Sequence, residues 1–148
     1  MSVVLDAYAV VAALLGEPAR REVEPHLSRA CISAVNLVEV VDVCVRVHGN
    51  AQSTVSERID WLMAGGLEVV SLDTAVAVAA GAFRARRYRK RECEISLGDS
   101  VAAALAAARG ELLATADPHL ANAAMADGIR LLPLPDTRGR RPLTRPRS

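Results

Sequence analysis

The chain has 148 residues, of which 51% are hydrophobic and only 3% aromatic, and a formal net charge of +1. This predicts one domain with a sizeable aliphatic core and argues against an aromatic platform that stacks single-stranded nucleic acid. The longest uncharged runs fall far short of the roughly 20 residues that a membrane span needs, so we expect no membrane association. Neither a signal-peptide pattern nor a C-x-x-C motif is present, which predicts a cytoplasmic protein with reduced thiols.

Short apolar runs alternate with helical segments along the chain. Strands are expected at 3–5, 30–33, 67–71, 111–114 and 129–132. Helices are expected at 7–15, 18–27, 37–47, 52–63, 74–88, 97–109 and 118–126. The 37–47 run is rich in β-branched residues and is assigned to a helix by its length. Alternation of this kind predicts an α/β fold in three α/β/α layers, with a central parallel sheet of about five short strands.

The chain is expected to divide into a domain at 1–133 and an Arg/Pro-rich flexible tail at 134–148. Basic residues gather in this tail and in one internal block. They are Arg84, Arg86, Arg87, Arg89, Lys90, Arg91, Arg138, Arg140, Arg141, Arg145 and Arg147. An acidic body with basic patches is typical of a metal site beside a surface that binds a polyanion. Alternatively, the same arginines form only a solvated face and a solvated tail.

Four acidic residues follow predicted strands or lie early in the next helix: Asp6, Glu39, Asp99 and Asp117. Each also has a structural explanation, as a helix cap or as a charge near a helix N-terminus. The carboxyl ends of parallel strands meet at one edge of a sheet, so the four are expected to converge there. Two unit charges about 4 Å apart repel by roughly 4 kcal/mol at an effective dielectric constant near 20, and a divalent cation removes that conflict. Oxygen ligands favour Mg²⁺ or Mn²⁺ over zinc.

Two neutral residues are candidates for supporting this site. Thr115 suits a hydrogen bond to a ligand carboxylate, or else it simply ends a strand. Asn36 suits the orientation of Glu39, or else it caps a helix. His119 is interpreted as a surface residue. The glycine-rich phosphate-binding motifs and the G-x-S-x-G motif are absent, so nucleotide cradles and hydrolases of those types are not expected.

Four motifs in order resemble PIN-domain ribonucleases, specifically the VapC-type toxins of bacterial type II toxin–antitoxin systems. The motifs are Val3-Val4-Leu5-Asp6-Ala7, the segment 32–40, Ile95-Ser96-Leu97-Gly98-Asp99-Ser100, and Leu113-Ala114-Thr115-Ala116-Asp117. The resemblance covers about residues 2–132 and implies a PIN-like fold. Tyr8 departs from the pattern, because many relatives carry a small hydroxyl residue there, and we assign it no catalytic role.

The resemblance implies Mg²⁺- or Mn²⁺-dependent hydrolysis of RNA phosphodiesters. In this interpretation Asp6, Asp99 and Asp117 bind the metal, and Glu39 completes the catalytic set. The candidate phosphate contacts are Arg86, Arg87, Arg89 and Arg91. The implied partners are an RNA substrate, a neutralising VapB-like antitoxin and a second copy in a homodimer. The alternatives are a PIN-type RNA-processing nuclease outside a toxin system and a non-catalytic RNA- or protein-binding α/β domain.

Overall fold

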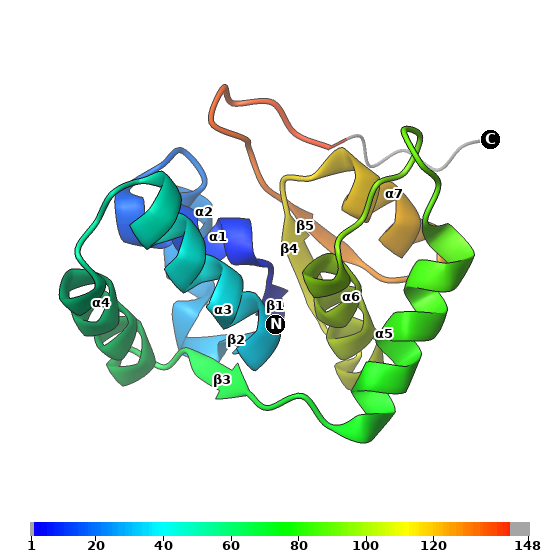
Figure 1. The fold of residues 1–148 in the computed structure, drawn as a ribbon, viewed down its shortest axis with the longest axis horizontal. Helices are drawn as coiled ribbons and strands as arrows, with labels where there is room; N and C mark the ends of the chain where they lie inside the picture. The colour runs from blue at the N-terminus through cyan, green and yellow to red at the C-terminus, as the bar shows by residue number, and fades with distance from the viewer. Residues whose placement is uncertain (1, 143–148) are drawn as a thin grey trace.

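A computed structural model describes residues 2–142, and in that range a five-stranded parallel sheet lies between two layers of helices (Figure 1). The strands are β1 (Val3–Leu5), β2 (Ala30–Ser33), β3 (Glu68–Val70), β4 (Leu112–Thr115) and β5 (Leu131–Pro133). The α-helices are α1 (Ala7–Leu15), α2 (Arg20–Val23), α3 (Ala34–Asp42), α4 (Gln52–Ala64), α5 (Thr74–Arg87), α6 (Leu97–Arg109) and α7 (Pro118–Ala126). The α/β/α fold class predicted from the sequence is confirmed.

The sheet order is β3-β2-β1-β4-β5, so the chain builds outward from β1 in one direction and then returns to build in the other. β1 pairs with β2 through Val4 and Cys31, and with β4 through Leu5 and Ala114. The order therefore reverses between β1 and β4, and ligands of open α/β sheets bind at such reversals, beyond the carboxyl ends of the strands.

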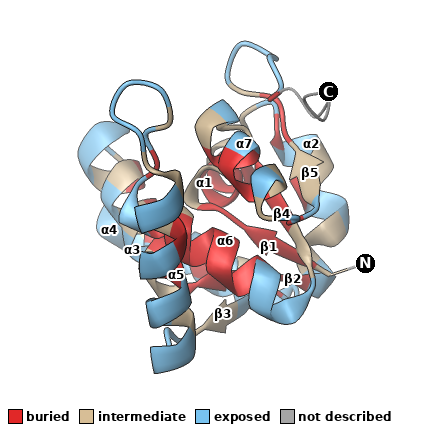
Figure 2. Cartoon of the chain, turned by 90° about the vertical axis from the view of Figure 1, so that its right-hand side faces the viewer, coloured by how far each residue is buried: buried red, intermediate tan, exposed pale blue. Residues whose placement is uncertain are grey.

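The two layers bury opposite faces of the same strands. Val3 and Leu5 of β1 pack into a cluster with α1 and α3, whereas Val4 packs into a second cluster with α6 and α7. All three residues are completely buried, as expected for the central strand of a parallel sheet covered on both faces. α6 is the most deeply buried helix of its layer, from Val101 to Ala106 (Figure 2).

Two predicted helices differ in detail from the structure. The expected helix at 18–27 is divided into α2 and a 3₁₀ helix at Glu24–Arg29, because Pro25 has no N–H with which to continue an α-helical ladder. The helix expected at 37–47 begins earlier, at Ala34, where the Ser33 hydroxyl caps it, and it ends in a π-helical turn at Val43–Val47.

The first part of the segment expected as a flexible tail, 134–148, is attached to the domain. Leu134 is fully buried in the core, and its N–H donates to the Thr115 carbonyl over 2.9 Å. The Tyr8 hydroxyl donates to the Pro135 carbonyl over 3.0 Å. The buried leucine and these two hydrogen bonds hold the start of the segment despite its polar composition. The remainder of the predicted tail, 143–148, lies outside the described residues.

Within residues 2–142, no helix has both the length and the hydrophobicity that crossing a bilayer requires.

Candidate active site

The four predicted carboxylates come from the end of the molecule where β1 and β4 finish. Asp6 follows β1 directly and is 4% exposed, and Asp117 follows β4 by two residues. Asp99 lies in the first turn of α6, and Glu39 lies in the middle of α3. Figure 1 shows the starts of α1, α6 and α7 at this same end of the sheet.

Asp6 and Asp117 both cap helices, as their structural explanation predicts. The Asp6 Oδ1 atom accepts the Ala9 N–H over 2.8 Å at the start of α1. The Asp117 Oδ1 atom accepts the His119 N–H over 2.8 Å at the start of α7. Each cap uses one carboxylate oxygen and fixes the orientation of the other. Capping and ligand binding are therefore compatible roles for the same side chain.

Asp99 belongs to a complete capping box with Ser96. The Asp99 Oδ2 atom accepts the Ser96 N–H over 2.8 Å, and the Ser96 hydroxyl accepts the Asp99 N–H over 3.0 Å. In the part of the chain that the structure describes, no hydrogen bond to Asp99 Oδ1 is recorded. Burial raises the pKa of Asp99, and the negative charge of Asp117 raises it further against the opposing effect of the Ser96 bonds.

Burial raises the pKa of Asp6 to about 7, and the charges of Asp99 and Asp117 act in the same direction. Two hydrogen bonds oppose this rise, one from the Thr115 hydroxyl and one from the Ala9 N–H. Thr115 is itself completely buried, and its Oγ1 accepts the Asp117 N–H over 3.1 Å. Thr115 therefore connects two of the four carboxylates, and this contact to a candidate ligand was one of its two predicted roles.

Glu39 reaches the site because α3 packs against α6. Its carboxylate lies directly against the backbone of Gly98, so a Cβ at that position would overlap it. Burial raises the pKa of Glu39, and the charge of Asp99 adds to this effect. Gly98 was not predicted as a site residue. A signal for it exists in the sequence, because glycine is a poor helix former and here occupies the first turn of an otherwise alanine-rich helix.

Asn36 joins the two helices at this point and is completely buried. Its Nδ2 donates to the Gly98 carbonyl over 3.1 Å, and its Oδ1 accepts the Ser33 hydroxyl over 2.5 Å. Among the described residues it makes no recorded hydrogen bond to Glu39. The predicted direct orientation of Glu39 is therefore replaced by an indirect one, in which Asn36 fixes the helix that carries Glu39.

Three of the four carboxylates have no balancing cation in the described chain. Asp6, Glu39 and Asp99 each have a raised pKa, and no arginine or lysine contributes to any of the three. Over residues 2–142, no three His, Cys, Asp or Glu side chains lie close enough to hold a metal ion in the present geometry. The donor set itself fits a hard divalent cation, because it consists of coupled carboxylate oxygens, with Asp6 buried and the other three partly buried.

The predicted phosphate-binding arginines have different surroundings from one another. Arg86 and Arg87 both bind Asp127, so neither is a free cation. The Arg89 guanidinium donates to the backbone carbonyls of Arg86 and Tyr88. Arg91 is exposed, and among the described residues its side chain has no recorded partner. The basic block is therefore partly neutralised, which its sequence did not indicate.

His119 holds the loop that carries this basic block. Its Nδ1 accepts the Glu94 N–H over 2.7 Å, and its carbonyl accepts the Cys93 thiol over 3.6 Å. His119 follows Asp117 by two residues, so the 88–96 loop is tied to the edge of the candidate site. The predicted surface position missed this contact, because nothing local in the sequence indicates a partner 25 residues away.

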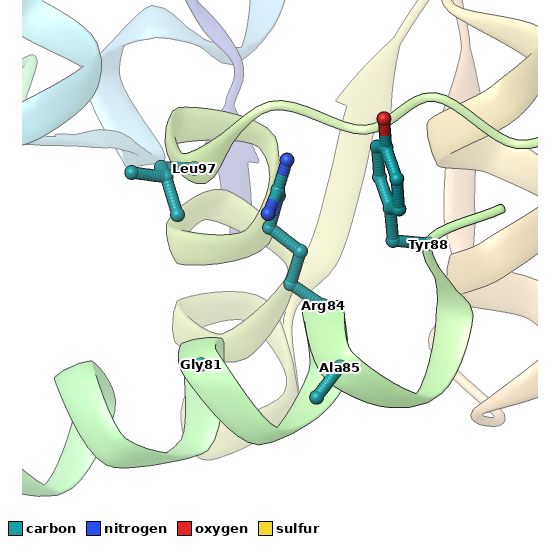
Figure 3. A pocket seen from close by; sticks show the side chains of 5 residues that line it. All are labelled: Gly81, Arg84, Ala85, Tyr88 and Leu97. Carbon is teal, nitrogen blue, oxygen red and sulfur yellow. The ribbon is translucent and has the colours of Figure 1, made fainter. Parts of the chain in front are cut away.

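An open groove of about 280 Å³ runs between α5 and the start of α6 (Figure 3). Its lining residues are Gly81, Arg84, Ala85, Tyr88 and Leu97. The Arg84 guanidinium lies over the Tyr88 ring, 4.5 Å from the centroid, and donates to the Ile95 carbonyl over 2.9 Å. Leu97 begins α6 two residues before Asp99, so the groove ends near the carboxylates without containing them.

The sequence profile of the PIN domain matches residues 3–125. We found no match to the sequence among curated proteins. Among solved structures, the chain is similar to VapBC from Salmonella typhimurium bound to DNA, with a TM-score of 0.70 and 24% identity, covering 89% of this chain and 97% of that one. It is also similar to VapBC2 from Rickettsia felis bound to a promoter DNA fragment, with a TM-score of 0.68 and 16% identity, covering 89% and 98%.

A third similar structure is VapC20 from Mycobacterium tuberculosis, described as a toxin that cleaves the sarcin–ricin loop. The TM-score is 0.57 with 16% identity, covering 74% of this chain and 85% of that one. At such low identities these structures establish a shared fold, whereas the profile match extends over most of the chain. The resemblance stated from the four motifs is confirmed: the chain belongs to the PIN-domain family, whose members are nucleases.

Proposed function

We propose that this protein is a divalent-metal-dependent endoribonuclease and the toxin of a toxin–antitoxin pair. The observation that carries the proposal is the set of coupled carboxylates around the buried Asp6, at the reversal point of a PIN-domain sheet. Such a set raises the free energy of the folded chain unless protons or a cation compensate it. A catalytic centre explains why the fold retains it.

The side chains divide the work according to the oxygens that they leave available. Asp6, Asp99 and Asp117 would hold Mg²⁺ or Mn²⁺, because each accepts a backbone N–H with one oxygen and directs the other away from that bond. Glu39 would complete the acidic set from α3, where its carboxylate lies against the backbone of Gly98. A bound divalent cation lowers the pKa of a coordinated water and offsets the charge of the scissile phosphate.

An RNA substrate fits the charge pattern around the site. The acidic set repels a polyanion, so a positively charged rim is needed to bring the phosphate backbone close. Arg89 and Arg91 lie in the loop that a hydrogen bond to His119 connects to α7. Arg86 and Arg87 extend this rim with the parts of their guanidinium groups that remain exposed beside Asp127. Contacts of this kind supply affinity and salt dependence, but they do not select a base sequence.

The similar structures support a protein partner. Two of them are complexes described as VapBC, and a cognate antitoxin is the corresponding partner here. We propose that an antitoxin neutralises the site and that the domain forms a homodimer. Both the RNA substrate and such an antitoxin place the protein in the cytoplasm.

The catalytic part of the proposal is tested by RNA cleavage with purified protein. We expect cleavage in Mg²⁺ that EDTA abolishes, and loss of that cleavage in Asp99→Asn with the fold retained, because asparagine still accepts the Ser96 N–H. Asp60→Asn on the exposed face of α4 is the matched control and should cleave as the unsubstituted protein does. Cleavage that survives in Asp99→Asn, or that persists in EDTA, contradicts the site.

The toxin part is tested separately by expression in a bacterial host. Growth arrest that depends on Asp99, and that is relieved by the neighbouring reading frame, supports a toxin with its antitoxin. RNA cleavage in vitro without growth arrest favours an RNA-processing nuclease of the same family.

A further inference from the structure

Residues 134–142 leave the last strand and pack beside the candidate site. Leu134 is fully buried, and its N–H donates to the Thr115 carbonyl over 2.9 Å. The hydroxyl of Thr115 in turn bonds the Asp6 carboxylate. The segment therefore begins next to Thr115 of the candidate site, on the side of the sheet that α1 and α2 cover.

Tyr8 fixes the next residue of the segment. The Tyr8 hydroxyl donates to the Pro135 carbonyl over 3.0 Å, across 127 positions of sequence. This contact gives a positioning role to Tyr8, to which the sequence assigned no catalytic role.

The rest of the segment is a folded turn. The Asp136 carboxylate accepts the N–H groups of Arg138 and Arg140 over 2.8 and 2.9 Å, and the Arg140 Nε over 3.0 Å. Beyond the turn, Arg141 forms an ion pair with Glu22 of α2. The segment is thus fixed at its start by Tyr8 and at its end by α2.

This turn and the 88–96 loop rise from the same end of the molecule, one on each side of it (Figures 1 and 2). The arginines near the two segments have different partners. At the end of α5, next to the loop, Arg86 and Arg87 share Asp127, whereas the exposed Arg138 side chain makes no hydrogen bond or ion pair among the described residues. Arg140 uses its Nε for Asp136 and leaves the outer end of its guanidinium exposed.

We propose that residues 134–142 form a fixed wall beside the four carboxylates. On this wall, Arg138 and the outer end of Arg140 contact the phosphates of a bound RNA. Tyr8 is a positioning residue that holds this wall in place. The inference rests on the proposed function and extends it to a second basic surface opposite the 88–96 loop. The wall adds affinity for the phosphate backbone without reading bases, since it offers charge at a fixed place and no aromatic or amide side chain.

Arg138→Gln tests the phosphate contact, with Arg29→Gln as its matched control. Arg29 is equally exposed, but it lies directly before β2, at the opposite end of the sheet. Both substitutions are made in Asp99→Asn protein, which prevents cleavage, and binding to a labelled single-stranded RNA of mixed sequence is measured across a salt series. We expect Arg138→Gln to weaken binding by about three- to tenfold and to reduce the slope of log K against log salt by about 0.7. Arg29→Gln should change neither.

The outcomes separate this inference from the proposed function. If the Asp99→Asn protein binds RNA in a salt-dependent way and Arg138→Gln binds as Arg29→Gln does, the wall is wrong and the proposed function stands. If the unsubstituted protein neither binds nor cleaves RNA, the proposed function fails and the inference fails with it.

Tyr8→Phe tests the positioning role without depending on RNA alone. Hydrogen exchange should become faster at the amides of Arg138, Gly139 and Arg140, while the amides of β1 keep their protection. In cleavage assays KM should rise and kcat should stay unchanged, because the wall binds substrate and takes no part in the reaction. Unchanged exchange in the turn, or a fall in kcat at constant KM, overturns this role for Tyr8.

Discussion

The acidic residues at the carboxyl edge of the sheet and those elsewhere in the domain have opposite surroundings. At the edge, burial raises the pKa of Asp6 and Asp99, and no arginine opposes the rise. Elsewhere several acids have arginine partners. A hydrogen bond from Arg141 lowers the pKa of Glu22, and at Asp127 two arginine bonds outweigh the effect of burial and lower the pKa.

The difference decides how each group affects stability. A carboxyl with a raised pKa binds its proton more tightly in the folded chain, so its favourable contribution is present at low pH and is lost as the pH rises through the folded pKa. A carboxyl with a lowered pKa stabilises the fold above its unfolded pKa and loses that contribution as the pH falls. At neutral pH the edge acids therefore oppose folding, while the arginine-paired acids support it.

The largest effect is expected from Asp6→Asn. Asparagine still caps α1, but it removes a carboxylate that the site needs, so cleavage should fall by at least on the order of 10²-fold. In EDTA at pH 8 the same substitution should raise the free energy of unfolding by roughly 2 kcal/mol, because the buried charge is gone. Cleavage assays and urea unfolding check the two parts. A loss of both activity and stability would contradict this account and indicate that Asp6 acts only as a helix cap.

The pH dependence of stability should follow the edge acids when no metal is present. In EDTA we expect the free energy of unfolding to fall as the pH rises from about 4 to 7, by up to about 1.4 kcal/mol per pH unit for each group that titrates. Asp6, with its pKa raised to about 7, should dominate the upper half of that range. Millimolar Mg²⁺ should flatten the curve, since a bound cation favours ionised carboxylates. Urea unfolding at several pH values, with and without Mg²⁺, measures this, and Asp6→Asn is the control that should reduce the slope.

Gly98→Ala should affect activity and stability differently, because it changes no charge. The new methyl group displaces the Glu39 carboxylate, which is the flexible end of a side chain, so we expect about tenfold slower cleavage. Stability should be unchanged or higher by up to about 1 kcal/mol, because alanine is the better helix former. Gly81→Ala on α5 is the matched control, since its Cβ meets open space. That variant should gain stability without losing activity, and a slower Gly81→Ala enzyme would contradict this account of Gly98.

The smallest effect is expected from Asp127→Asn. This substitution breaks two partly exposed ion pairs and should lower the free energy of unfolding by about 1 kcal/mol. It also releases Arg86 and Arg87, so RNA affinity should rise modestly and depend more steeply on salt. Equilibrium unfolding and a salt series of RNA binding measure the two changes. Unchanged RNA affinity would remove these two arginines from the substrate rim.

Much of the fold followed from local pattern. The bounds of β1 and α1 agree with the prediction, since a β-branched run, an aspartate cap and a closing glycine are all local signals. Pro25 shows the limit of that local pattern, because its missing N–H interrupts the α-helix expected at 18–27. Leu134 shows the limit of composition, because a leucine beside a strand end is buried in the core although the segment that it begins is otherwise mostly polar and exposed.

The acids of the candidate site were predictable and their partners were not. Strand order alone places Asp6 and Asp117 at the same edge. The contact between Glu39 and Gly98 needs the packing of α3 on α6, and the pairing of Arg86 and Arg87 with Asp127 joins positions 40 or 41 residues apart. Sequence shows how many charges a segment carries, whereas tertiary structure determines how many of them are free.

The reversal of the sheet at β1 has a consequence for the chain during its synthesis. Asp6 is made early relative to its partners: its N–H bonds the Ala114 carbonyl and its carboxylate bonds Thr115, both in a strand made more than a hundred residues later. The acids of the candidate site cannot meet until β4 has entered the sheet beside β1. A nuclease of the proposed kind would thus begin to emerge from the ribosome without an assembled site and acquire one only after β4 has been made.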